Sequence, residues 1–132
     1  MLSAVTAALM TIVGKIGLKN IDSTLATGIR SLIMFVFMIS VVIFTGKLKG
    51  INTIDQKSFL VITLSAIFGA LSWIFYFVAL RYAPASKVSA IDRLSLIFVI
   101  LLSLAFLGEK LNFKLAIGSI LATAGIIFIT LA

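Results

Sequence analysis

Five long apolar runs, separated by short polar connections, constrain this chain more than any other feature of its sequence. The runs cover residues 1–18, 25–45, 58–80, 85–107 and 115–132. A bilayer core about 30 Å thick is crossed by roughly 20 residues of α-helix. Inside hydrocarbon, only helices and closed barrels pair all of their backbone polar groups. Because the runs are continuous rather than alternating strands of about ten residues, they predict an all-α, polytopic membrane bundle of five transmembrane helices.

The ends of these runs carry residues that are typical of helix termini. Asp22, before the second run, belongs to the residue types that cap helix N-termini. Gly46 can close the same helix, Pro84 suits the first turn of the fourth, and Gly108 ends the fourth. No connection is long enough for a soluble domain, so we expect a single transmembrane domain over residues 1–132. The first run lacks the basic start and small-residue cleavage site of a signal peptide, and is therefore expected to be a helix.

Composition excludes several classes of protein. Apolar residues make up 62% of the chain and charged residues only 11%, against about 25% in soluble domains, so neither a soluble nor a disordered chain fits. The absence of cysteine and histidine removes disulfides and the usual metal sites, and no cofactor is expected. Of the four acids, only Asp92 lies inside an apolar run, so no paired-carboxylate enzyme site is expected. Basic residues are scattered singly, which argues against nucleic-acid binding.

The distribution of basic residues between the connections predicts an orientation in the membrane. With Lys15, Arg30 and Arg93 excluded as residues within helices, three bases lie near one membrane face and five near the other: Lys19, Arg81 and Lys87 against Lys47, Lys49, Lys57, Lys110 and Lys114. The positive-inside rule then places the N-terminus in the cytoplasm and the C-terminus outside the cell membrane. If the three helical bases are counted, the bias disappears, which permits insertion in both orientations.

Several short motifs occur in the order found in a known family. ALRYAPA (residues 79–85) joins the third and fourth runs, LGEKL (residues 107–111) joins the last two, and Gly118 and Gly125 follow; GK at 14–15 and GIR at 28–30 come earlier. This order resembles the EamA domain of the drug/metabolite transporter superfamily over nearly the whole chain. Many such domains have a helix-breaking proline near the position of Ser95, where this chain reads IDRLS (residues 91–95).

The resemblance implies a secondary transporter or exporter of small metabolites. Larger members carry two such domains, whereas this chain carries one, so pairing is expected: a homodimer, possibly antiparallel, or a heterodimer with a similar half-size chain. Five helices form a thin wall for an enclosed pathway, and transporters of this kind place a site between repeated halves. The sequence contains no ATP-binding element, so the energy would come from a gradient and the mechanism would be alternating access.

Charged residues inside the apolar runs are the candidate substrate site. A charge at the bilayer centre costs about 2.5–3.5 kcal/mol, and Arg30, Asp92 and Arg93 lie roughly 10–12 Å into helices that start on one side of the membrane. Lys15 ends the first helix on that side. Ser89 shares with Asp92 and Arg93 one arc of the fourth helix. We expect a polar cavity, although snorkelling of the long side chains with a structural ion pair is the alternative.

Within that cavity, Asp92 is expected to pair with Arg30 or Lys15, which leaves a base to bind substrate. The excess of positive charge favours a substrate with a carboxylate. An amino acid fits, with its carboxylate at Arg93 or Arg30 and its ammonium group at Asp92.

Two further groups of residues have two interpretations each. Trp73 and Tyr76, three residues apart on the third helix, can line the substrate path or form an interfacial aromatic belt. Gly118, Ala122 and Gly125 form a small-residue face on the fifth helix, which favours close helix packing or dimerisation.

We therefore expect a dimeric membrane transporter of a small metabolite, with an amino acid or another small carboxylate favoured. One alternative is a multidrug-type exporter of lipophilic cations, which predicts an unpaired embedded acid. The other is a membrane scaffold or accessory subunit, in which the embedded charges are dispensable for flux.

Overall fold

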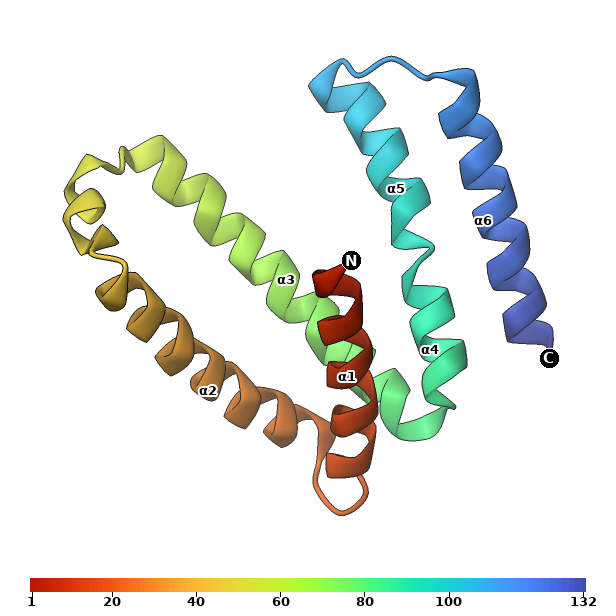
Figure 1. The fold of residues 1–132 in the computed structure, drawn as a ribbon, viewed down its shortest axis with the longest axis horizontal. Coiled ribbons are helices and arrows are strands. Elements are labelled where there is room, and N and C mark those ends of the chain that lie inside the picture. The colour runs from red at the N-terminus through yellow and green to blue at the C-terminus, as the bar shows by residue number, and fades with distance from the viewer. The chain divides into compact units, whose positions relative to one another are not determined.

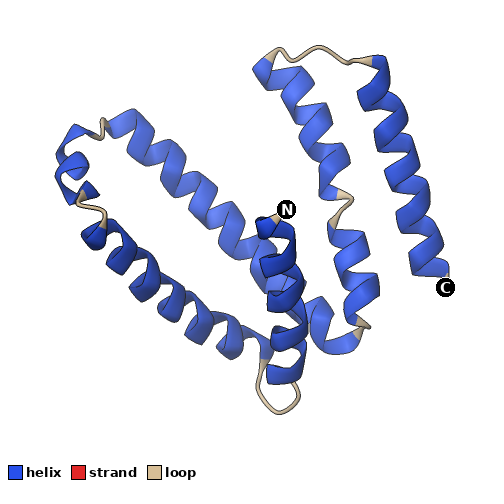
Figure 2. Cartoon of the chain, in the orientation of Figure 1, coloured by secondary structure: helices blue, strands red, loops and turns tan.

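The computed structural model describes all 132 residues, and they form helices without any strand (Figures 1 and 2). The expectation of an all-α polytopic membrane protein is confirmed. The elements, in chain order, are α1 (Leu2–Gly17), α2 (Ser23–Phe44), the short 3₁₀ helix η1 (Lys47–Thr53), α3 (Gln56–Tyr82), α4 (Ala85–Asp92), α5 (Ser95–Leu102), the π-helical segment η2 (Ser103–Leu107) and α6 (Phe113–Leu131).

Four stretches of helix are long and apolar enough to cross a membrane. They are α2, α3, the span from Ala85 to Leu107, and α6. Helix α1 is apolar but has only 16 residues, which is about 24 Å of helix. Large apolar side chains point outward from the spans: Phe35, Phe37 and Phe68 are 64%, 66% and 68% exposed. Such exposure is unfavourable in water and is expected where lipid chains surround a helix.

The helix ends are held by the residues that the sequence indicated, with one addition. The Asp22 carboxylate accepts hydrogen bonds from the backbone N–H groups of Thr24 and Leu25, at 2.9 and 3.1 Å, and so caps α2. Gly46 and Gly108 follow α2 and η2 with φ of +68° and +65°, a conformation that glycine adopts without steric penalty. Asn112 caps α6 by accepting a bond from the N–H of Lys114.

The fourth span is interrupted, whereas the sequence predicted one continuous helix over residues 85–107. Helix α4 ends at Asp92 and α5 begins at Ser95, and the break is visible in Figure 1. Across it, the N–H groups of Arg93, Leu94, Leu96 and Ile97 bond to carbonyls three residues earlier, which tightens the helix. No proline is needed for this break. Aspartate and serine compete with the backbone for hydrogen bonds in helix interiors, and they flank the break here.

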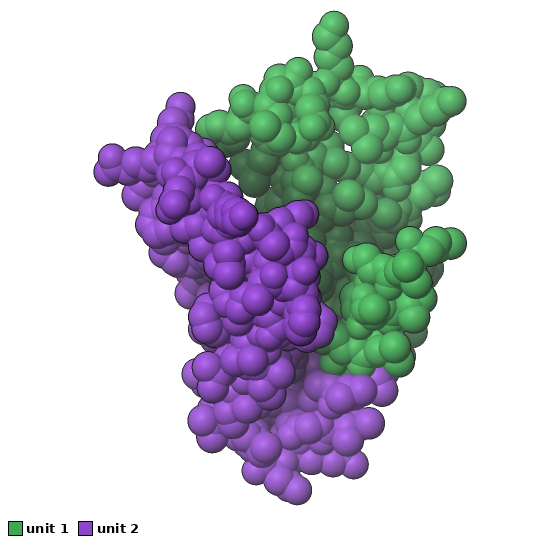
Figure 3. Space-filling model, turned by 60° about the vertical axis from the view of Figure 1, so that its left-hand side comes forward, with its two compact units in different colours: residues 1–11, 82–132 green, residues 12–81 purple.

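The chain divides into two compact units, coloured separately in Figure 3. Unit 1 comprises Met1–Thr11 and Tyr82–Ala132, and unit 2 comprises Ile12–Arg81. In unit 1, α4 packs beside α6, and the Lys87 ammonium donates to the Thr130 carbonyl at 3.2 Å. In unit 2, Leu18, Phe77 and Leu80 are buried, and Leu80 is fully enclosed. The buried part of unit 2 therefore lies where the end of α3 meets the α1–α2 connection.

Candidate functional site

Arg30 of α2 is stacked on aromatic rings of α3. Its guanidinium carbon lies 3.6 Å from the centroid of the Trp73 ring and 4.8 Å from that of Phe77. Cation–π contacts of this kind are worth about 2 kcal/mol when desolvated, which offsets part of the cost of an arginine in hydrocarbon. A stacked guanidinium directs its N–H groups within its own plane, in the fork geometry that matches a carboxylate. Unit 2 therefore brings together Arg30 and Trp73, two of the candidate substrate-site residues predicted from the sequence.

Tyr76 lies next to this stack. Its ring meets that of Phe77 edge to face, with centroids 5.9 Å apart, a favourable arrangement of two aromatic quadrupoles. Phe77 is 3% exposed and so forms the centre of the aromatic cluster. Phe77 was not among the predicted site residues, although its position four residues after Trp73 indicates the same face of α3.

Lys15 and Arg81 tie together the ends of three helices in unit 2. The Lys15 ammonium at the end of α1 donates to the backbone carbonyls of Leu80 and Arg81, where α3 ends. A cation at a helix C-terminus is stabilised by the exposed carbonyls and the helix dipole. Arg81 forms an ion pair with Asp22 at 3.5 Å. Lys15 thus has a structural role that the sequence did not reveal, and its predicted pairing with Asp92 stays a prediction.

Hydrogen bonds hold the Asp22 carboxylate in its charged form. The backbone N–H of Leu25 and that of Thr24 both donate to it, and they lower its pKa below the ordinary value; Arg81 adds a smaller effect in the same direction. Asp22 precedes the apolar part of α2, and its ion pair with Arg81 links the α2 N-terminus to the end of α3.

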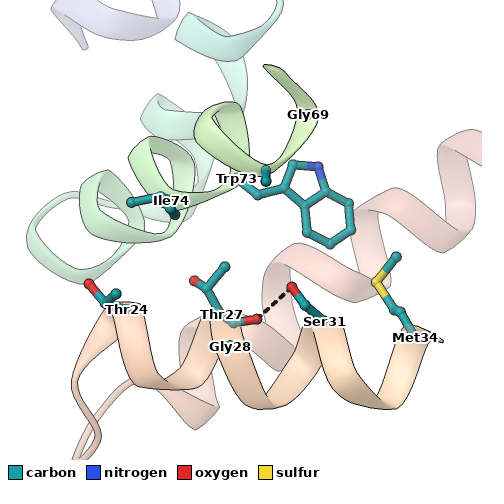
Figure 4. Close-up of a pocket in the computed structure, with 9 residues that line it drawn as sticks. Thr24, Thr27, Gly28, Ser31, Met34, Gly69, Trp73 and Ile74 are labelled. Atoms are coloured by element: carbon teal, nitrogen blue, oxygen red, sulfur yellow. Dashed lines mark hydrogen bonds between the residues drawn. The ribbon is translucent and has the colours of Figure 1, made fainter. Parts of the chain in front are cut away.

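A groove of about 520 Å³ lies between α2 and α3, and we call it the α2–α3 groove. Figure 4 shows its walls. Thr24, Thr27 and Ser31 supply hydroxyl groups from α2, and Met34, Gly69 and Trp73 supply much of the apolar lining. The spacing of Thr24, Thr27 and Ser31 repeats along one face of a helix, a signal that sequence reasoning missed. Trp73 borders this groove, and the Arg30 guanidinium lies over its ring.

The remaining candidate charges belong to unit 1. Asp92 and Arg93 are exposed and sit at the break between α4 and α5, and Ser89 is half-buried one turn earlier. Arg30 and Lys15 belong to unit 2. A cavity shared by all four charges therefore stays a prediction.

The small-residue face of α6 is open in the single chain. A Cβ atom built on Gly118 or Gly125 would meet no atom within 4 Å, and Ala122 is half-buried. Neither glycine is used for close packing within the chain, so its predicted use in packing or dimerisation stays a prediction.

Comparisons with known proteins identify the family. The model of the EamA-like transporter family matches residues 1–131. A protein from Sinorhizobium sp., named "Uncharacterized transporter in cobO 3'region", is 34% identical over 125 residues, covering 95% of this chain and 89% of the relative. No solved structure matches significantly. These findings point to transport rather than enzymatic chemistry. The chain belongs to the EamA-like transporter family and is a multi-pass membrane transporter of the drug/metabolite type.

Proposed function

We propose that this transporter carries a small metabolite with a carboxylate, with an amino acid favoured, and that Arg30 binds the carboxylate. The supporting observation is the stack of Arg30 on Trp73 and Phe77 inside a membrane span. The rings hold the position of the guanidinium without neutralising its charge. A fixed, charged fork of N–H donors in a medium of low dielectric constant binds a planar anion strongly. Lipophilic cations, the main alternative substrates, would be repelled by the same charge.

Alternating access between two membrane faces would then move the substrate, driven by a gradient. Arg93 and Asp92 are proposed to contact the substrate during transport, with Asp92 accepting the ammonium group of an amino acid. The break between α4 and α5 supports this role, because interrupted transmembrane helices are where transporters commonly place substrate sites. On the base count, we place the N-terminus in the cytoplasm of the cell membrane and the C-terminus outside.

Uptake into proteoliposomes tests the proposal. The substrate panel comprises amino acids, other organic anions and lipophilic cations. We expect saturable uptake of one or more carboxylates, and we expect Arg30→Ala and Arg93→Ala each to abolish it. Arg30→Lys should retain only part of the activity, since lysine keeps the charge but loses the bidentate geometry. Lys110→Ala, in the connection between η2 and α6, is the matched control and should transport normally.

Two outcomes would contradict the proposal. Normal transport by both Arg30→Ala and Arg93→Ala variants would remove the carboxylate site. Uptake of lipophilic cations, with no uptake of carboxylates, would assign a multidrug function instead. Membrane insertion of every variant is checked by its yield in the detergent extract and by its circular dichroism.

We further propose that the transporter works as a dimer, with the face of Gly118, Ala122 and Gly125 on α6 at the interface. The open space at both glycines supports this, because small residues let helices approach closely in lipid. The chain has no cysteine, so Ala122→Cys can report the contact through disulfide cross-linking in the native membrane. In a two-fold interface, a residue near the axis meets its own copy.

Cross-linking at Ala122→Cys is expected to be efficient. Ile120→Cys, on the opposite face of α6, is the control and should remain uncross-linked. The reverse pattern would place the dimer contact on another surface. A requirement for a second, different chain would appear as cross-linking only when both chains are co-expressed.

A further inference from the structure

The α2–α3 groove has a polar pattern that the carboxylate site does not explain. The Thr27 hydroxyl donates to the Ser23 carbonyl at 2.7 Å, and the Ser31 hydroxyl donates to the Thr27 carbonyl at 2.8 Å; the second bond is drawn in Figure 4. Each hydroxyl hydrogen is therefore committed to the helix backbone, and each oxygen keeps lone pairs as acceptors. Toward an occupant, these two side chains offer acceptors, which repel a carboxylate and attract a hydrogen-bond donor.

The rest of the groove is apolar and larger than a small polar acid requires. Met34, Gly69, Ala70, Trp73 and Ile74 supply the apolar walls. A volume of about 520 Å³ falls within the roughly 300–1,000 Å³ of pockets that hold drug-sized molecules. Burial of an apolar group there gains free energy in proportion to the area removed from water.

Trp73 joins the groove to the charged site. Its ring lines the groove and lies 3.6 Å from the Arg30 guanidinium carbon. A molecule can therefore place its acid group at Arg30 and a longer apolar part along α2 and α3, past the hydroxyl oxygens.

We infer that the α2–α3 groove is a specificity site for the apolar part of a carboxylate substrate. It selects organic acids with a bulky apolar group and a hydroxyl or ammonium donor over small polar acids. This inference rests on the proposed function, since the acid group of the ligand is held at Arg30.

Trp73 provides a direct reporter, because it is the single tryptophan of the chain. The probes are phenylalanine, 3-phenylpropionate and glycine, titrated against the purified protein in lipid vesicles while tryptophan emission is recorded. Phenylalanine should change the emission and bind at least about tenfold more tightly than glycine, because its ring is removed from water. 3-Phenylpropionate, which lacks the ammonium donor, should bind more weakly than phenylalanine.

Gly69→Leu tests the groove without touching Arg30. A Cβ at Gly69 would meet no atom within 4 Å, so the variant is expected to fold and to fill the groove with its side chain. Phenylalanine should then bind about tenfold more weakly, whereas glycine binding should be unchanged. Ser72→Leu, an exposed position on α3 outside the groove, is the matched control and should bind both probes as the parent protein does. Thr27→Val should reduce, but not remove, the preference for phenylalanine over 3-phenylpropionate, because it deletes one of several acceptors available to the ammonium group.

Failure of this inference is distinguishable from failure of the proposed function. If acids bind in an Arg30-dependent manner but with the same affinity whatever their apolar group, the groove is not the specificity site. The same conclusion follows if Gly69→Leu leaves the affinity for phenylalanine unchanged. If no acid binds and a lipophilic cation such as tetraphenylphosphonium changes Trp73 emission, the carboxylate transporter itself is excluded. Equal emission changes in the Gly69→Leu and Ser72→Leu proteins would likewise overturn the groove assignment.

Discussion

Arg30 in unit 2 and Arg93 in unit 1 are the same residue type in the same kind of apolar run, yet their surroundings differ. Arg30 is half-buried and stacked on Trp73 and Phe77. Arg93 is exposed at a break in its helix, next to the exposed Asp92. One charge is therefore part of the packing of its unit, and the other lies at a discontinuity of the backbone. A charged residue in an apolar run implies a free-energy cost of placing that charge in hydrocarbon. Only the local geometry shows which contacts offset this cost.

The largest expected effect is a difference in the free energy of unfolding between the Arg30→Ala and Arg93→Ala proteins. Arg30→Ala removes the cation–π stack and should lower the free energy of unfolding by about 2 kcal/mol. Arg93→Ala removes no such contact and should change stability by less than about 0.5 kcal/mol. Both variants are expected to lose transport. Reversible unfolding in mixed micelles, followed by circular dichroism, measures the difference. Equal destabilisation by both substitutions would remove the distinction between the two units.

A second test compares two glycines of α1, and an effect of about 1 kcal/mol is expected. A Cβ at Gly14 would lie 3.0 Å from the edge of the buried Phe77 ring, so Gly14→Ala should destabilise unit 2 by overpacking. Gly17 has open space at the same place, so Gly17→Ala should be neutral or slightly stabilising through helix propensity. The same unfolding assay reads both variants. Stabilisation by Gly14→Ala would indicate that Phe77 is free to move.

The smallest expected effect is a pH dependence of stability that arises from Asp22, the N-cap of α2. The pKa of Asp22 is lowered by hydrogen bonds from Leu25 and Thr24, so its stabilising contribution is present above the unfolded pKa and is lost as the pH falls through the folded pKa. The loss should therefore appear below about pH 4. Asp22→Asn retains a good N-cap but loses the charge. Melting temperatures of the two proteins should converge on acidification, and a constant difference between pH 7 and pH 3 would contradict this.

The membrane helices themselves could be predicted from the sequence because hydrocarbon leaves the backbone few choices. The caps at Asp22, Gly46 and Gly108 could be predicted for a local reason, since each depends on one residue and its immediate neighbours. The break at Arg93–Leu94 could not, because no proline marks it. It arises from a change to hydrogen bonds between residues three apart, which the apolar periodicity of the run conceals.

Sequence alone was sufficient for the class of this protein and for the choice of Arg30 and Trp73 as candidates, because a charge or a large aromatic in an apolar run is visible without coordinates. Tertiary structure decided which groups meet. The bonds of Lys15 depend on how α1 meets the end of α3, whereas the stacking of Arg30 on Trp73 and Phe77 and the groove lined by Thr27 and Ser31 depend on how α2 crosses α3. That crossing is set by side-chain packing between helices distant in sequence, which the periodicity within a single helix does not encode.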